Sequence, residues 1–208
     1  RHPRVKVVCP PVSMSMAEHW EWALAQARGE WLMFVGQDDG LQSYFFRLAE
    51  KLTAYADRNR VRTIMSERAY FFWPGCEAFY GDTSVEYSAV PGLRVLNFTY
   101  QGLRALFGGQ PYFELPEMYT TSLFRRGLIE EAKDRQGGRL FVTHPQDANL
   151  AAIAFSLESR YLRCRIPLGW VGSSPKSAGL AVAASLATRP ADAANGELAS
   201  LREDYLGR

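Results

Sequence analysis

The stretch WLMFVGQDDG, residues 31–40, decides how we interpret this chain. Its first six residues are apolar or glycine, which is typical of a buried strand, and Asp38, Asp39 and Gly40 follow shortly afterwards. In an open α/β sheet, ligands bind beyond the carboxyl ends of the strands, so two carboxylates are expected where a ligand would lie. A divalent cation bridging to phosphate oxygens would relieve their mutual repulsion. The alternative is an ordinary solvated turn, because Asp and Gly are also common turn residues.

Strands and helices are expected to alternate on both sides of this stretch. Ser15 and Glu18 have the spacing of a capping box, which predicts where the first helix begins. The expected elements are strand 4–8, helix 16–27, strand 31–35, a helix from Ser43, strands 62–65 and 69–73, a helix near 98–107, strand 118–124, helices 125–135 and 147–157, and strand 161–166. Because such helices join strands through right-handed crossovers, the order predicts an α/β fold, with one mainly parallel, Rossmann-like sheet flanked by helices.

Composition limits the class of protein. The 208 residues are 47% hydrophobic and 13% aromatic, which suits a domain with a sizeable core. A net charge of +2 argues against a nucleic-acid partner. Cys9, Cys76 and Cys164 lie far apart and have no metal-ligand spacing, so free thiols and a cytoplasmic location are expected. No apolar stretch approaches the roughly 18 residues of a transmembrane helix.

Residues 15–41, SMAEHWEWALAQARGEWLMFVGQDDGL, resemble the central motif of bacterial family 2 glycosyltransferases of the GT-A fold. In that family a helix leads into an apolar strand that ends in Asp-Asp or Asp-x-Asp. Three later segments are similar to the same family: YTTSLFRR at 119–126, HPQD at 144–147 and PLGWVGSSPKS at 167–177. By this resemblance, residues 1–180 form a glycosyltransferase 2-like domain whose first nucleotide-binding strand would precede the chain. Residues 181–208 are expected to form a helical tail.

The resemblance implies a GT-A-like fold and an inverting transfer of a sugar, of the hexosyltransferase type, from a nucleotide-diphosphate donor. The acceptor would be a glycan, a lipid or a small molecule. Asp39 would bind Mn²⁺ or Mg²⁺, and Asp38 would be a second ligand or a contact to the donor ribose. Asp147 stands where the family places the base that takes the acceptor proton. The alternative is that Asp147 only caps its helix.

The polar loop after residue 171 offers a second group of binding residues. Ser174, Lys176 and Ser177 would bind the donor diphosphate through hydroxyls, backbone N–H groups and one positive charge. A surface loop without a ligand is equally compatible with this composition. For the whole chain, the alternative to an enzyme is a non-catalytic binding or interaction module of the same fold.

Overall fold

The computed structural model describes residues 5–81, 84–142, 146–175 and 177. Residues 5–28 belong to one compact unit and residues 29–177 to another, and each is described by itself. In the first unit, helix α1 (Met16–Gln26) begins at Ser15, whose side chain and that of Glu18 form reciprocal hydrogen bonds with the backbone. The predicted capping box is therefore confirmed. Residues 5–8 do not form the predicted strand, and the side chains of Val5 and Val7 are exposed.

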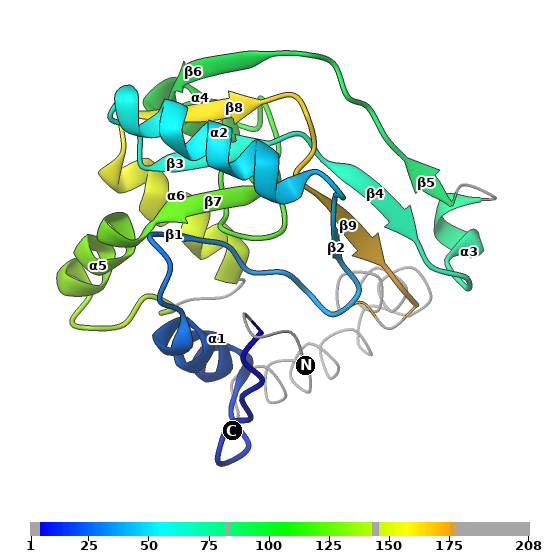
Figure 1. Cartoon of the computed structure of the whole chain (residues 1–208), viewed down its shortest axis with the longest axis horizontal. Coiled ribbons are helices and arrows are strands. Elements are labelled where there is room, and N and C mark those ends of the chain that lie inside the picture. Colours follow the sequence, from blue (N-terminus) through cyan, green and yellow to red (C-terminus); the bar gives the residue numbers. More distant parts are fainter. Residues whose placement is uncertain (1–4, 82–83, 143–145, 176, 178–208) are drawn as a thin grey trace. The chain divides into compact units, whose positions relative to one another are not determined.

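The second unit contains two sheets (Figure 1). The larger has the order β1-β7-β3-β8-β6, and the smaller has the order β2-β9-β4-β5. The strands are β1 (Trp31–Leu32), β2 (Gly40–Leu41), β3 (Thr63–Ser66), β4 (Ala69–Phe72), β5 (Val85–Glu86), β6 (Leu93–Asn97), β7 (Ser122–Arg125), β8 (Arg160–Cys164) and β9 (Gly169–Ser173). The helices are α2 (Phe45–Arg58), α3 (Glu77–Tyr80), α4 (Phe98–Leu106), the 3₁₀ helix η1 (Tyr112–Glu114), α5 (Arg126–Arg135) and α6 (Gln146–Leu157).

The predicted single, mainly parallel, Rossmann-like sheet is wrong, and with it the GT-A-like fold class. The pairs β3–β8 and β4–β9 are parallel, but the other neighbouring strands in both sheets are antiparallel. The crossover through α2 does connect β1 to β3, yet β7 lies between these strands and pairs antiparallel with both. The local sequence around a crossover does not show that a much later strand will occupy the space between its two strands, which explains the error.

Helices cover both faces of the larger sheet because successive side chains of a strand point to opposite sides. On one face, α2 packs against a core cluster that includes Leu52, Ala56, Ile64, Leu123 and Leu162. On the other face, Tyr161 contacts Phe98 of α4, with 4.9 Å between the ring centroids, and Phe98 also contacts Phe155 of α6. Figure 1 shows α2 in front of the sheet and α6 behind it.

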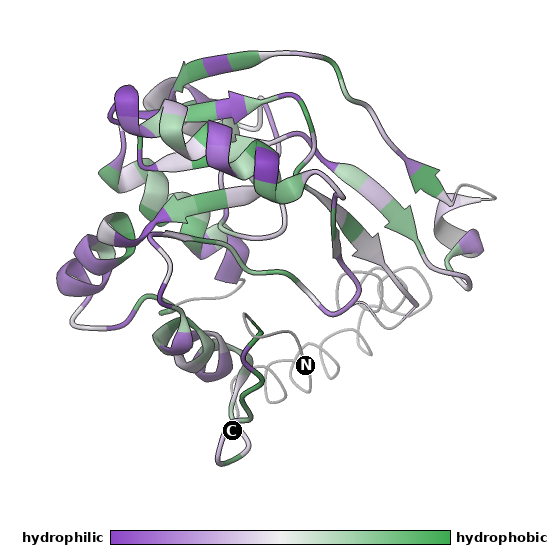
Figure 2. Cartoon of the chain, viewed as in Figure 1, coloured by the Kyte–Doolittle hydropathy of each residue, from purple (hydrophilic) through white to green (hydrophobic). Residues whose placement is uncertain are grey.

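Most of the predicted helices are confirmed, with shifts at their ends. The helix predicted from Ser43 begins at Phe45, and those near 98–107, 125–135 and 147–157 correspond to α4, α5 and α6. Of the predicted strand 31–35, only Trp31–Leu32 is a strand. The prediction missed β2, β5, β6, α3 and η1, and it assigned part of β9 to a loop. Figure 2 shows α5 in mostly hydrophilic colours, in keeping with a surface helix. The predicted tail, residues 181–208, lies outside the described residues.

Within the described part of the chain, no helix is both long enough and apolar enough to cross a membrane.

Candidate functional site

Asp39 joins three segments of the second unit. Its Oδ2 accepts hydrogen bonds from the N–H of Gly36, at 2.8 Å, and from the hydroxyl of Thr120. Its Oδ1 accepts from the N–H of Gly172 in β9, at 2.8 Å. The hydroxyl of Tyr119 also hydrogen-bonds to this carboxylate. A carboxylate has about four lone-pair positions, so these four donors occupy the acceptor capacity of Asp39.

Asp38 is less fully bonded than its neighbour. Its Oδ2 accepts a hydrogen bond from the hydroxyl of Ser177, and the same hydroxyl oxygen accepts from the N–H of Ser174 at 2.8 Å. Among the described residues, Ser177 is the only donor to the Asp38 carboxylate. The structure therefore places Ser174 and Ser177 next to Asp38, as expected for one site. Lys176, the predicted cation of this loop, lies outside the described residues.

Asp147 lies in the first turn of α6, where its negative charge interacts favourably with the helix dipole. Its Oδ1 accepts a hydrogen bond from the N–H of Ala148 at 2.8 Å, and its Oδ2 accepts from the hydroxyl of Tyr112 at 3.3 Å. These bonds orient the carboxylate, and the one from Ala148 satisfies an N–H of the first turn, but Asp147 lies inside α6, which begins at Gln146, and not at its N-cap position.

The charges of the three predicted carboxylates act on one phenol, that of Tyr119. Tyr119 is largely buried, and burial is the main cause that raises the pKa of its hydroxyl. The negative charges of Asp39, Asp38 and Asp147 raise it further, so all three act on the same hydroxyl. The Tyr119 hydroxyl therefore lies against Asp39, feels the charges of Asp38 and Asp147 as well, and remains protonated.

A buried ion pair lies beside this group and was missed by the sequence analysis. Glu117, whose side chain is 3% exposed, pairs with Arg68, which also donates to the carbonyl of Phe113 at 2.6 Å. Burial raises the pKa of Glu117 to about 7, against the opposing charge of Arg68, and Asp147 raises it further. In the described part of the chain, Glu117 Oε2 has no hydrogen-bond partner.

The sequence contains a signal for some of the site residues that were not predicted and none for the others. Tyr119 and Thr120 belong to the segment 119–126 that resembles family 2 glycosyltransferases, but no role was assigned to them. Met118, directly before them, has a φ of 52°, a left-handed conformation that is uncommon for a residue with a side chain. No pattern in the sequence links Glu117 to Arg68, because the two residues are 49 positions apart and meet only in the folded chain.

One of the two carboxylates at the turn, that of Asp38, can still bind a hard cation. In the described ranges, no group of three or more His, Cys, Asp or Glu side chains is placed to hold a metal ion. Mg²⁺ commonly binds one or two protein carboxylates and takes its remaining ligands from water and substrate phosphate. Asp38 retains acceptor capacity for such a cation, whereas Asp39 is occupied by four donors. The predicted metal-binding role of Asp39 stays a prediction.

Comparison with known proteins assigns no family to this chain. No protein-family model matches it, and no curated protein matches it. The resemblance to family 2 glycosyltransferases rests on the segments quoted from the sequence.

Proposed function

We propose that this chain is a glycosyltransferase that moves a hexose-type sugar from a nucleotide-diphosphate donor to the hydroxyl group of an acceptor. The observation that carries the proposal is that the Tyr119 hydroxyl, which hydrogen-bonds to Asp39, also feels the charges of Asp38 and Asp147. These carboxylates lie in segments that resemble the donor-binding and base-containing motifs of family 2 glycosyltransferases. The free thiols of Cys9, Cys76 and Cys164 support a cytoplasmic location for the reaction.

On the donor side, Asp38 is the residue best placed to bind Mn²⁺ or Mg²⁺. A cation there would neutralise the charge that develops on the departing diphosphate. Asp39 holds the turn in place through its bonds to Gly36, Thr120 and Gly172. The hydroxyls of Ser174 and Ser177 are additional donors for diphosphate oxygens, once Ser177 exchanges its bond to Asp38 for one to the ligand.

On the acceptor side, Asp147 would act as the general base. As the acceptor oxygen forms its bond to the anomeric carbon, its proton passes to an Asp147 oxygen, and the bond to the diphosphate breaks with its electron pair. The hydroxyl of Tyr112 and the N–H of Ala148 hold the carboxylate in position for this step. Attack on the face opposite the diphosphate inverts the configuration of the sugar.

A non-catalytic binding module is the second candidate function. It is favoured by the saturated carboxylate of Asp39 and by the lack of a metal-binding cluster among the described residues. A module of this kind would bind a nucleotide sugar or a related ligand without turnover.

Titration calorimetry with UDP-, GDP- and dTDP-sugars, in Mn²⁺ and in EDTA, tests the proposal. We expect one donor to bind in Mn²⁺ and not in EDTA, and Asp38→Asn to abolish that binding. Release of the nucleoside diphosphate, measured with a mixture of acceptors, then separates the enzyme from the module. If no donor binds in either buffer, the proposal is wrong.

A further inference from the structure

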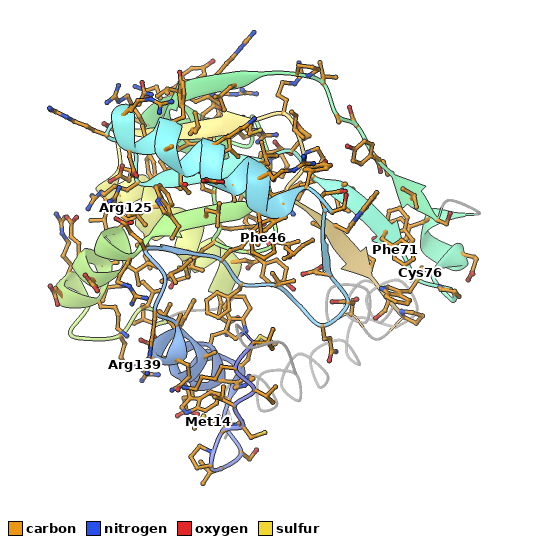
Figure 3. The ribbon with its side chains drawn as sticks, in the orientation of Figure 1. Met14, Phe46, Phe71, Cys76, Arg125 and Arg139 are labelled. Atoms are coloured by element: carbon orange, nitrogen blue, oxygen red, sulfur yellow. The ribbon has the colours of Figure 1, made fainter. Side chains whose placement is uncertain are left out.

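The smaller sheet has an aromatic face, which we define by Phe71, Trp73, Tyr87 and Trp170. Phe71 pairs with Gly172 of β9 and with Val85 of β5. Residues two apart on a strand share a face, so Trp73, Trp170 and Tyr87 lie on the same side as Phe71. Figure 3 labels Phe71 on β4, and Figure 2 shows this strand in mostly hydrophobic colours.

Specific contacts hold these rings in place. Phe71 and Trp73 meet edge to face, with 5.0 Å between their centroids, and the rings of Tyr87 and Trp170 are 5.5 Å apart. The hydroxyl of Tyr87 hydrogen-bonds to that of Tyr44 at 3.1 Å. Even so, Trp73 and Tyr87 are 44% and 46% exposed. They therefore present partly ordered ring surface to solvent, which lowers the entropic cost of binding a ligand.

The aromatic side chains on the other side of β4 pack into the core of this sheet. Phe72 packs against Cys76, with Tyr70 beside them, and the rings of Phe72 and Tyr80 stack at 3.9 Å. Phe72 and Cys76 are buried. The core of this sheet is thus formed by the opposite face, and it does not require the exposed rings of Trp73 and Tyr87.

The aromatic face lies against the candidate site. The indole Nε1–H of Trp73 donates a hydrogen bond to the main-chain carbonyl of Asp38 at 3.1 Å. Gly172 donates its N–H to Asp39, and the main chain of Asp38 covers the face where a Gly172 side chain would lie. A ligand lying on Trp73 would therefore have one end next to the turn that carries Asp38 and Asp39, which we call the acidic turn.

The charge of the face indicates the class of ligand. The described strand positions on this side carry no charged side chain: Gly40, Ala69, Phe71, Trp73, Val85, Tyr87, Trp170 and Gly172. A polyanion such as RNA would need positive charges here and would be repelled by Asp38 and Asp39. A neutral pyranose instead packs its apolar C–H face on a flat ring, and its hydroxyls donate to carboxylate and hydroxyl oxygens at the edge.

We propose that the aromatic face binds a neutral saccharide and presents it to the acidic turn as the acceptor of the transfer. This inference rests on the proposed function and specifies its acceptor. Trp73 is the stacking surface nearest the reacting end, and Tyr87 with Trp170 supports the sugar units farther from it.

A glycan array of neutral and acidic saccharides, probed with the labelled chain, tests this directly. The best neutral saccharide is then titrated by calorimetry without donor. We expect Trp73→Ala and Tyr87→Ala each to weaken its binding about tenfold, as for the loss of a central aromatic contact. Phe107→Ala is the matched control, because Phe107 is 86% exposed at the end of α4, and it should leave the affinity unchanged.

The variants are first checked by circular dichroism, and Tyr87→Ala serves alone if Trp73→Ala is misfolded, because Tyr87 makes no hydrogen bond to the acidic turn. The proposal is overturned if no neutral saccharide is retained, if polyuridylate binds more tightly than any saccharide, or if neither substitution weakens binding. Saccharide binding without donor binding would retain the aromatic face and reject the transfer reaction. If a donor binds and neither substitution weakens the binding of the acceptor, the transfer reaction is retained and the aromatic face is rejected as the acceptor site.

Discussion

A β-carbon added to Gly172 would lie 1.7 Å from the main-chain oxygen of Asp38, so the acidic turn rests directly on the backbone of β9. The added methyl group has to displace either the turn or the strand. We therefore expect Gly172→Ala to lower the free energy of unfolding by about 1–3 kcal/mol, as overpacking does. Urea denaturation measures this change, and calorimetry should show weakened donor binding.

Gly127 in α5 provides the control for this substitution. A β-carbon there meets no other atom within 4 Å, so Gly127→Ala should be neutral or should stabilise the helix by about 0.5–1 kcal/mol. Equal stability of the two variants would show that the turn and β9 are not in close contact.

The two adjacent aspartates should differ in their effect on stability. Asp39→Ala leaves the N–H groups of Gly36 and Gly172 and the hydroxyl of Thr120 without their acceptor, which should cost about 3 kcal/mol. Asp38→Ala removes one acceptor of the Ser177 hydroxyl and should cost less than about 1 kcal/mol. Chemical denaturation of both variants checks the difference. The reverse order of stability would contradict the assignment of Asp39 as the residue that holds the turn.

Asp147 should matter for turnover and not for donor affinity. Asp147→Asn keeps the size of the side chain and one acceptor oxygen for the N–H of Ala148 but loses the base, so we expect turnover to fall about 10²- to 10⁴-fold. Rates of diphosphate release and calorimetric donor affinities provide the measurement. Asp134→Asn, on the exposed side of α5, is the control. An active Asp147→Asn variant would show that Asp147 only stabilises the first turn of α6.

Glu117 should make stability depend on pH. Its pKa is about 7 in the folded protein, compared with 4.5 as the ordinary value, because it is buried. Folding therefore takes up a proton between these two values, and the stability that this proton provides is lost as the pH rises through about 7. The difference in unfolding free energy between the parent and Glu117→Gln should shift by up to about 3 kcal/mol from pH 4.5 to pH 8.

Urea titrations of both proteins at several pH values measure this shift. Isotope-edited infrared spectroscopy of the glutamate carboxyl groups should also show a protonated group that disappears near pH 7 and is missing in Glu117→Gln. A difference in stability that does not vary with pH would mean that Arg68 keeps Glu117 ionised throughout this range.

Local patterns in the sequence were sufficient for the longer helices but not for the order of the strands in the sheets. The capping box at Ser15 and the apolar periodicity of α4, α5 and α6 depend on neighbouring residues, and these helices form where they were expected. The position of β7 between β1 and β3 depends on residues about 60 to 90 apart, for which the single sequence has no local signal. The same distinction applies to the site, where Asp38 and Asp147 were recognisable by their local context, whereas Glu117 and Arg68 were not.

The pairing of β1 with β7 has a consequence for folding. Among the described strands, β7 is the only partner of β1, and Asp39 accepts hydrogen bonds from Thr120 and Gly172. Neither β1 nor the turn is held in place until these residues, far downstream, have been synthesised. Such high contact order slows folding, because long loops must close before their contacts form. During translation the acidic turn is therefore expected to stay unstructured until β9 has left the ribosome. The chain would therefore acquire ligand affinity only after β9 has been synthesised and paired.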